Sequence, residues 1–120
     1  MARGEIGFVG LGIMGKPMVR NLMKADYSVT VYDIVSESVE EMVTDGAKAA
    51  SSAAEVAQSA STVITMVPDS PQSEAAILGP NGVLEGTSSG STVIDMSSIA
   101  PASSQKIAKA CENAGVNFLD

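Results

Sequence analysis

Three glycines stand in the order G-x-G-x-x-G, as Gly10, Gly12 and Gly15. They follow an apolar run, residues 6–9, and open an amphipathic stretch, residues 14–25, so we expect a strand before them and a helix after them. In that setting Gly10 permits a tight turn, Gly12 leaves the backbone open to a diphosphate, and Gly15 lets the helix pack on the strand. The N–H groups at the helix start would then face the anion. The spacing predicts dinucleotide binding, and the alternative is a plain turn.

A carboxylate follows the next apolar run. Asp33 lies 18 residues after Gly15, at the end of the expected second strand, where a carboxylate can accept hydrogen bonds from an adenosine ribose. Ile34 and Val35 follow it, so a 2′-phosphate would meet a like charge and no counter-ion there. The sequence therefore favours NAD over NADP. The alternative role for Asp33 is a cap at the end of a strand.

Two further segments follow apolar runs and would meet at the same edge of a parallel sheet. They are residues 66–70, Met-Val-Pro-Asp-Ser, and residues 96–101, Met-Ser-Ser-Ile-Ala-Pro. In one interpretation these loops flank a nicotinamide and its ribose, because open α/β sheets bind ligands at the carboxyl ends of their strands. In the other, Ser70 caps a helix while Ser97 and Ser98 satisfy loop backbone groups. Spacing alone leaves both open.

These residues need a scaffold, and short apolar runs alternate with amphipathic stretches along the whole chain. Strands are expected over residues 6–9, 29–32, 63–67, 92–96 and 116–119, with a brief edge strand within 46–50. Helices are expected over residues 14–25, 36–45, 53–60, 71–78 and 102–114, with at most one helical turn in the loop 79–91. The alternation predicts an α/β fold, a Rossmann-like, doubly wound and mostly parallel sheet with helices on both faces.

Two helix starts have recognisable caps. Ser52 and Glu55 have the spacing of a capping box. Ser70 precedes Pro71 and is predicted to be an N-cap residue. Further along the chain, the single cysteine, Cys111, falls on an amphipathic helix and is predicted to be a small buried hydrophobe.

Composition excludes several classes of function. The 120 residues carry a net charge of −7, which argues against binding nucleic acid or an anionic membrane surface. No apolar run has the length of a membrane span. The chain has no histidine, so a Ser-His pair or a His-ligated metal is excluded within it, and one cysteine cannot form a zinc cluster. A lone thiol without a secretion signal indicates the cytoplasm, or the mitochondrial matrix in a eukaryote.

Three linked segments resemble the β-hydroxyacid dehydrogenase family, which includes 3-hydroxyisobutyrate dehydrogenase. They are residues 6–18, residues 64–68 and residues 94–101. The last of them is most similar to the tartronate semialdehyde reductase (2-hydroxy-3-oxopropionate reductase) branch. That branch typically reads Leu-Pro-Asn where this chain has Val67, Pro68 and Asp69.

The resemblance implies a set of cofactor contacts. The glycine turn and Asp33 would hold the adenosine diphosphate, Val67 and Pro68 would flank the cofactor, and Ser98 would contact its nicotinamide end, with Gln72 at a position where some relatives use Asn. Ser97 is included among the expected cofactor contacts because it directly follows an expected strand. The full expected cofactor site is Gly10, Leu11, Gly12, Ile13, Met14, Gly15, Asp33, Val67, Pro68, Gln72, Ser97 and Ser98.

The resemblance also implies what the 120 residues do not contain. Family members continue into a helical domain with a Ser-Gly-Gly turn and a catalytic lysine, and none of the five lysines here, Lys16, Lys24, Lys48, Lys106 and Lys109, falls on a strand-end loop. We therefore expect residues 1–120 to be the NAD-binding domain of an oxidoreductase, a fragment without catalytic or metal-binding residues of its own. The parent would exchange hydride with a small 3-hydroxy or 3-oxo acid bound through the absent domain, and would be a homo-oligomer. The alternatives are a non-catalytic nucleotide-binding or scaffold module and an S-adenosylmethionine-binding methyltransferase.

Overall fold

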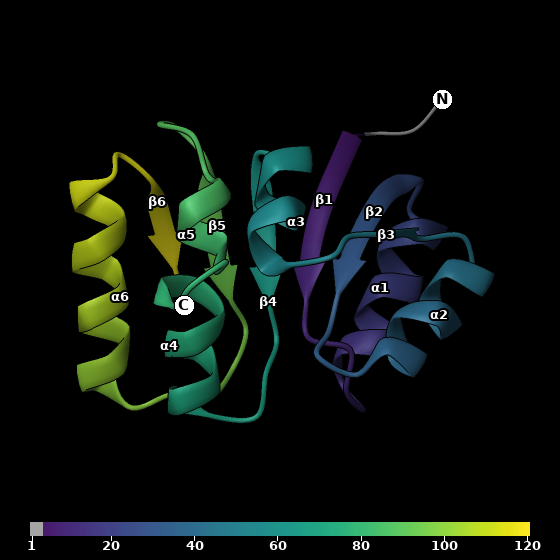
Figure 1. Cartoon of the computed structure of the whole chain (residues 1–120), viewed down its shortest axis with the longest axis horizontal. Helices are drawn as coiled ribbons and strands as arrows, with labels where there is room; N and C mark the ends of the chain where they lie inside the picture. The colour runs from purple at the N-terminus through teal and green to yellow at the C-terminus, as the bar shows by residue number, and fades with distance from the viewer. Residues whose placement is uncertain (1–3) are drawn as a thin grey trace.

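The computed structural model describes residues 4–120 and consists of one twisted sheet between two layers of helices (Figure 1). The strands are β1 (Gly4–Val9), β2 (Tyr27–Tyr32), β3 (Lys48–Ala49), β4 (Thr62–Thr65), β5 (Thr92–Asp95) and β6 (Asn117–Leu119). The helices are α1 (Gly15–Lys24), α2 (Ser36–Thr44), α3 (Ala53–Ser59), α4 (Ser70–Leu78), α5 (Val83–Gly86) and α6 (Pro101–Asn113).

All the strand pairings are parallel, and the strand order is β3-β2-β1-β4-β5-β6. The chain runs outward from β1 to β3, returns to the centre, and runs outward again from β4 to β6. The predicted Rossmann-like, doubly wound fold is therefore confirmed, and the strand order reverses between β1 and β4, where such sheets bind ligands.

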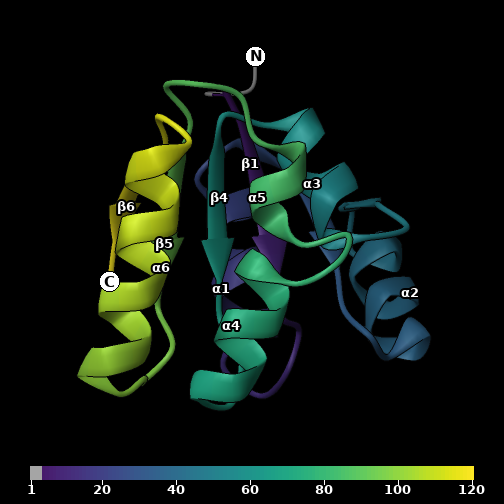
Figure 2. The ribbon, with the colours of Figure 1, turned by 60° about the vertical axis from the view of Figure 1, so that its left-hand side comes forward.

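Alternation along the strands creates two apolar cores, one on each face of the sheet. Phe8 faces α1 and α2 and packs with Val29, Val31 and Met42. Val9 points to the other face, where the core includes residues of β4, β5, α3, α4, α5 and α6. Figure 2 shows α4 and α6 side by side on that second face, and Cys111 of α6 is fully buried in it, as predicted. Burial raises the pKa of the Cys111 thiol.

The helix starts agree with the sequence in part. The Ser52 hydroxyl accepts a hydrogen bond from Glu55 N at 3.1 Å, as a capping box requires, while the Glu55 carboxylate binds Ser51 instead of reaching back to Ser52. The prediction that Ser70 is an N-cap residue is wrong. Asp69 occupies the N-cap position, and the Ser70 hydroxyl accepts a hydrogen bond from Ala100 N at 2.8 Å, because a backbone N–H from the next loop lies within reach.

No helix in the described part of the chain is both long and apolar enough to cross a membrane.

Candidate functional site

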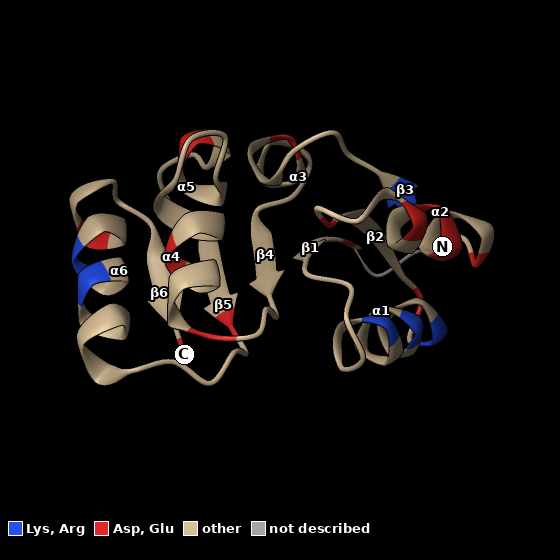
Figure 3. Ribbon diagram, turned by 60° about the horizontal axis from the view of Figure 1, so that its bottom comes forward, with Lys and Arg blue, Asp and Glu red and all other residues tan. Residues whose placement is uncertain are grey.

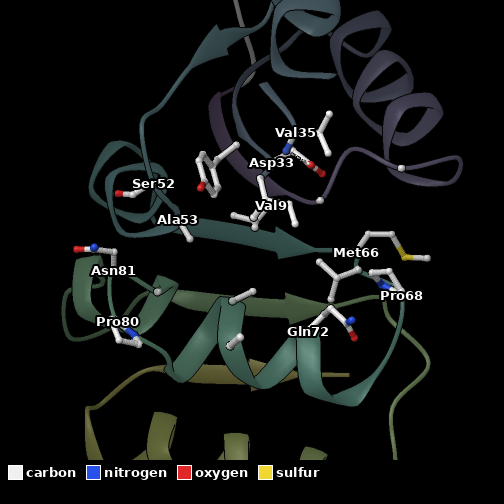
Figure 4. A pocket seen from close by; sticks show the side chains of 18 of the residues that line it. Val9, Asp33, Val35, Ser52, Ala53, Met66, Pro68, Gln72, Pro80 and Asn81 are labelled. Carbon is white, nitrogen blue, oxygen red and sulfur yellow. Dashed lines mark hydrogen bonds between the residues drawn. The ribbon is translucent and has the colours of Figure 1, made fainter. Parts of the chain in front are cut away.

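A cleft of about 810 Å³ lies where the strand order reverses, along the carboxyl ends of β1, β2 and β4. Figure 4 shows its walls. Met66, Pro68 and Gln72 lie toward one end, Ser52, Ala53, Pro80 and Asn81 lie toward the other, and Val9, Asp33 and Val35 lie along a third side. Its volume is within the range of small-molecule and cofactor sites.

The glycine turn, residues 10–15, forms part of the cleft lining, and packing requires glycine at two of its positions. Gly10 has a φ of 107°, and a Cβ there would lie 2.0 Å from the carbonyl oxygen of Met66. A Cβ on Gly15 would lie 2.0 Å from the carbonyl oxygen of Gly10, because α1 starts against the turn. Both positions therefore exclude any side chain, for reasons internal to the protein.

Gly12 differs from its two neighbours. A Cβ at this position would meet no atom within 4 Å, and its φ is not in the left-handed region. Packing alone would thus allow alanine. What glycine leaves at this point is an open approach to the backbone from the cleft, which is the property that a diphosphate site needs.

The start of α1 adds the donors. Met14 is its N-cap residue, and no side chain caps its N–H groups, although Lys16 N donates to the carbonyl oxygen of Gly12 at 3.1 Å. Such N–H groups, with the helix dipole behind them, favour an anion. Ile13 and Met14 are exposed, and Ile13 lines the cleft beside this end of the helix.

Asp33 closes the turn from the side of β2. One carboxylate oxygen accepts a hydrogen bond from Leu11 N at 2.6 Å, and the other accepts one from Val35 N at 2.8 Å. A carboxylate offers about four lone-pair sites, so acceptor capacity remains on the half-buried group beyond these two bonds. The side chain also lines the cleft, and it is thereby both fixed in position and able to accept from a hydroxyl.

The charge in the described cleft lining is negative, with no basic side chain to offset it. Among residues 4–120, Asp33 is the only charged side chain in the cleft lining. The nearest basic side chains on α1 face α2, where Lys16 binds Glu41 at 3.0 Å and Arg20 binds Glu41 at 2.7 Å and Asp45 at 2.9 Å. Figure 3 shows Lys and Arg segments on α1 and Asp and Glu segments on α2, in the half of the molecule away from β4 and β5. These bonds, that from Lys16 foremost, lower the pKa of the Glu41 carboxyl.

The opposite wall is held by side chains of the two loops after β4 and β5. The Ser97 hydroxyl accepts a hydrogen bond from Val67 N at 2.8 Å, and Ser97 N donates to a carboxylate oxygen of Asp95 at 3.1 Å. Ser97 is buried, whereas Ser98 is exposed and lines the cleft. Of the two sequence interpretations of these serines, the geometry gives Ser97 a backbone-satisfying role and leaves Ser98 facing the cleft.

The structure brings most of the predicted cofactor residues together. Eight of them line the cleft, namely Gly10, Gly12, Ile13, Asp33, Val67, Pro68, Gln72 and Ser98. The other four lie outside its lining, namely Leu11, Met14, Gly15 and Ser97. Leu11, Gly15 and Ser97 are buried beneath the lining residues. Met14 is exposed to solvent.

Sequence reasoning missed one wall of the cleft. It is formed by Ser51, Ser52, Ala53, Ala75, Ala76, Pro80, Asn81 and Gly82. The capping box correctly located the start of α3, but only the strand order shows that this start faces α4 across the cleft. The alanines of α4 are small enough to leave room there, which no local pattern indicates.

The cleft lining contains few groups able to move a proton. Within the described residues its ionisable side chains are Asp33 and Tyr32, both at the end of β2. No cluster of His, Cys, Asp or Glu able to hold a metal ion occurs in residues 4–120. The arrangement can bind and orient a dinucleotide, and the part of its lining that the structure describes has no ionisable side chain on the β4–β5 side.

Comparisons with known proteins agree with this geometry. Residues 5–120 match the family model described as the NAD binding domain of 6-phosphogluconate dehydrogenase. Human mitochondrial 3-hydroxyisobutyrate dehydrogenase is 43% identical over 119 residues, which are 99% of this chain and 35% of that protein. Escherichia coli 2-hydroxy-3-oxopropionate reductase is 36% identical over 116 residues, 97% of this chain and 39% of that protein.

A solved structure extends the likeness to three dimensions. The complex of Psf3 with NADP+ and 2-OPP superposes with a TM-score of 0.88 at 25% sequence identity, covering 94% of this chain and 40% of that one. The chain thus spans well under half the length of each of these relatives. With its open glycine turn, its doubly wound sheet and the match over residues 5–120, the chain belongs to the family of NAD-binding domains typified by that of 6-phosphogluconate dehydrogenase.

Proposed function

We propose that residues 1–120 form the cofactor domain of a dehydrogenase or reductase and bind NAD in the cleft described above. The observation that carries the proposal is the open face of Gly12, flanked by the uncapped start of α1 and by the fixed carboxylate of Asp33. The diphosphate would lie over Gly12, and the adenosine ribose would donate to Asp33. The other predicted contacts are Val67, Pro68, Gln72 and Ser98.

The preference for NAD over NADP rests on charge. A 2′-phosphate beside Asp33 would meet its carboxylate, and the cleft lining within residues 4–120 offers no Lys or Arg to offset the repulsion. Lys16 and Arg20 are held by Glu41 of α2 and, for Arg20, by Asp45 directly after α2. Because the similar Psf3 structure binds NADP+, the selectivity must come from residues of this kind and not from the fold.

For the whole protein we propose hydride transfer between NAD and a small 3-hydroxy or 3-oxo acid, such as 3-hydroxyisobutyrate or tartronate semialdehyde. The named activities of the human and E. coli relatives support this substrate class. In the direction of reduction, the nicotinamide of NADH would supply the hydride and a group outside the described cleft lining would supply the proton; in oxidation, NAD would accept the hydride and that group the proton. We place the protein in the cytoplasm and expect it to be a homo-oligomer.

The direct test is a fluorescence titration with NADH. Gly12→Asp should abolish binding, because a carboxylate would project into the diphosphate site, while thermal stability should change little, since the position is open. Asn113→Asp is the matched control, because it adds the same charge to an exposed residue at the end of α6. Retention of NADH affinity in Gly12→Asp would refute the assignment of the turn.

A second titration addresses the form of the cofactor. The unmodified chain should bind NADH more tightly than NADPH, and the reverse order would overturn the argument from Asp33 while leaving dinucleotide binding intact. Turnover of 3-hydroxyisobutyrate or tartronate semialdehyde by the full-length protein tests the substrate class. Tight NADH binding without turnover of either acid would favour a non-catalytic nucleotide-binding module.

A further inference from the structure

A buried polar network joins the two loops on the β4–β5 side of the cleft. The Thr65 hydroxyl donates to one carboxylate oxygen of Asp95 at 2.9 Å, and Ser97 N donates to the same oxygen at 3.1 Å. The Ser97 hydroxyl accepts from Val67 N at 2.8 Å. Three short bonds therefore lead from the end of β4, through Asp95, to the backbone of the loop that carries Val67.

Stability does not explain a carboxylate at this position. Asp95 is 1% exposed and Thr65 is fully buried, and the second carboxylate oxygen of Asp95 has no hydrogen-bond partner within residues 4–120. Burying a carboxylate with one oxygen unpaired costs free energy, and a well-packed apolar residue in such a place is often no less stable. A buried polar group of this kind calls for a reason other than core packing.

The geometry supplies that reason. By accepting from Ser97 N two residues on, Asp95 bends the chain directly after β5, as Asp side chains do in turns. The bend directs the Ser97 hydroxyl toward Val67 N and leaves the next residue, Ser98, in the cleft wall. Removal of the carboxylate would release Ser97 and the link to Val67 together.

The position of this network in the sheet indicates which part of the cofactor it serves. A doubly wound sheet binds a dinucleotide across the point where the strand order reverses, with one mononucleotide on each side. Asp33 lies on the β2 side and would hold the adenosine half. Val67 and Ser98 follow β4 and β5 on the other side, which is left for the nicotinamide half.

We propose that Asp95 is a positioning residue, which never touches the cofactor and sets the loops of Val67 and Ser98 that bind its nicotinamide half. This inference rests on the proposed function and deepens it. It also assigns Ser97 as the link in this network, in place of the direct contact that its strand-end position suggested.

The test compares two ligands in the full chain, NADH and ADP, which lacks the nicotinamide half. Asp95→Leu puts an apolar side chain of similar size in place of the carboxylate and removes the acceptor of Thr65 and Ser97. We expect it to weaken NADH binding about tenfold and ADP binding less than about twofold. Asp95→Asn retains one carbonyl oxygen in the same place, so it should restore most of the NADH affinity.

A purely structural role for Asp95 would give another result. Asp95→Leu would then weaken NADH and ADP equally, or weaken neither, and either outcome overturns the proposal. If Asp95→Leu does not fold, Ser97→Ala decides the question, because it leaves the Thr65–Asp95 bond intact and removes only the acceptor of Val67 N. It too should weaken NADH selectively, and equal losses for both ligands would refute the network.

Failure of the proposed function would look different. In that case the unmodified chain would bind neither NADH nor ADP, and no variant would be needed to show it. An unmodified chain that binds both ligands, together with an Asp95→Leu variant that binds both equally well, refutes the positioning role alone.

Discussion

The two halves of the sheet build their shares of the cleft in different ways. On the β1–β2 side the turn is bare backbone at Gly10 and Gly12, and it is tied at Leu11 by the carboxylate of Asp33, 22 residues further along the chain. On the β4–β5 side, hydrogen bonds between residues 30 apart connect the loops, from Thr65 to Asp95, from Val67 to Ser97 and from Ala100 to Ser70. One half is shaped by missing side chains and the other by specific polar ones, so they should fail in different ways when mutated.

The largest expected effect comes from adding one methyl group to the bare half. In Gly10→Ala the new Cβ would lie 2.0 Å from a backbone oxygen of Met66, and φ is 107°, so neither atom can yield without moving a strand. We expect a loss of about 3 kcal/mol or more in the free energy of unfolding, measured by urea titration followed by circular dichroism.

Gly12→Ala is the matched control for that variant. The same methyl group enters open space, so the free energy of unfolding should change by less than about 1 kcal/mol, while NADH binding should weaken because the diphosphate is kept from the backbone. Equal destabilisation by the two substitutions would show that the turn is not divided into packing and binding glycines.

Next in size is the removal of the carboxylate that ties the bare half. Asp33→Ala would leave the N–H of the buried Leu11 without its acceptor, and we expect a loss of about 1–3 kcal/mol in stability together with weaker NADH binding. Asp69→Ala is the control, since it removes an exposed carboxylate whose side chain makes no cap hydrogen bond. A loss of NADH affinity without any loss of stability would show that Asp33 does not support the turn.

Cofactor preference should shift toward NADPH without removing the hydrogen bonds of Asp33 or those between the loops after β4 and β5. Val35→Arg places a guanidinium beside Asp33. The cleft lining of the described chain has no cation there. Val35 is 47% exposed, so a larger side chain can extend into solvent. We expect NADPH binding to strengthen about tenfold, measured by fluorescence titration, because Arg pairs well with phosphate. Unchanged NADPH affinity would place the adenosine ribose elsewhere than at Asp33.

A smaller effect is expected from one bond of the β4–β5 half. Ser70→Ala removes the acceptor of Ala100 N at a partly exposed site, where water can replace it, so stability should fall by about 0.5–1 kcal/mol. Ser104→Ala is the control, because this half-buried serine of α6 also loses one side-chain hydrogen bond, which it makes to Asp120. If Ser70→Ala destabilised the chain as much as Asp33→Ala, the two halves would not differ as described.

The contrast between the halves also explains how far the sequence could be interpreted. The positions of the glycine turn, between β1 and α1, and of Asp33, directly after β2, agree with the sequence, because they depend on local backbone rules and on a spacing set by one strand–helix–strand unit. The role of Ser97 stayed open and that of Ser70 was wrong, because each is decided by an N–H group 30 residues away in sequence. The wall at Ser52 and Asn81 was missed, since only the strand order brings the starts of those segments together.

The smallest expected effect on stability concerns the ion pairs that Lys16 and Arg20 of α1 make with Glu41 and Asp45. Lys16 and Arg20 lower the pKa of the exposed Glu41 carboxyl from its usual 4.5 in the folded chain. A depressed carboxyl pKa stabilises the fold above the unfolded value and ceases to do so as the pH falls through the folded value. Glu41→Gln should therefore lower the Tm slightly at pH 7, and by less in added salt, and the difference from the unmodified chain should shrink as the pH falls below 4.5 and through the lowered pKa of the folded chain. NADH affinity at pH 7 should not change, since the pairs lie away from the cleft. A Tm difference that grew on acidification would reverse the sign of this linkage and remove the ion pairs from the account.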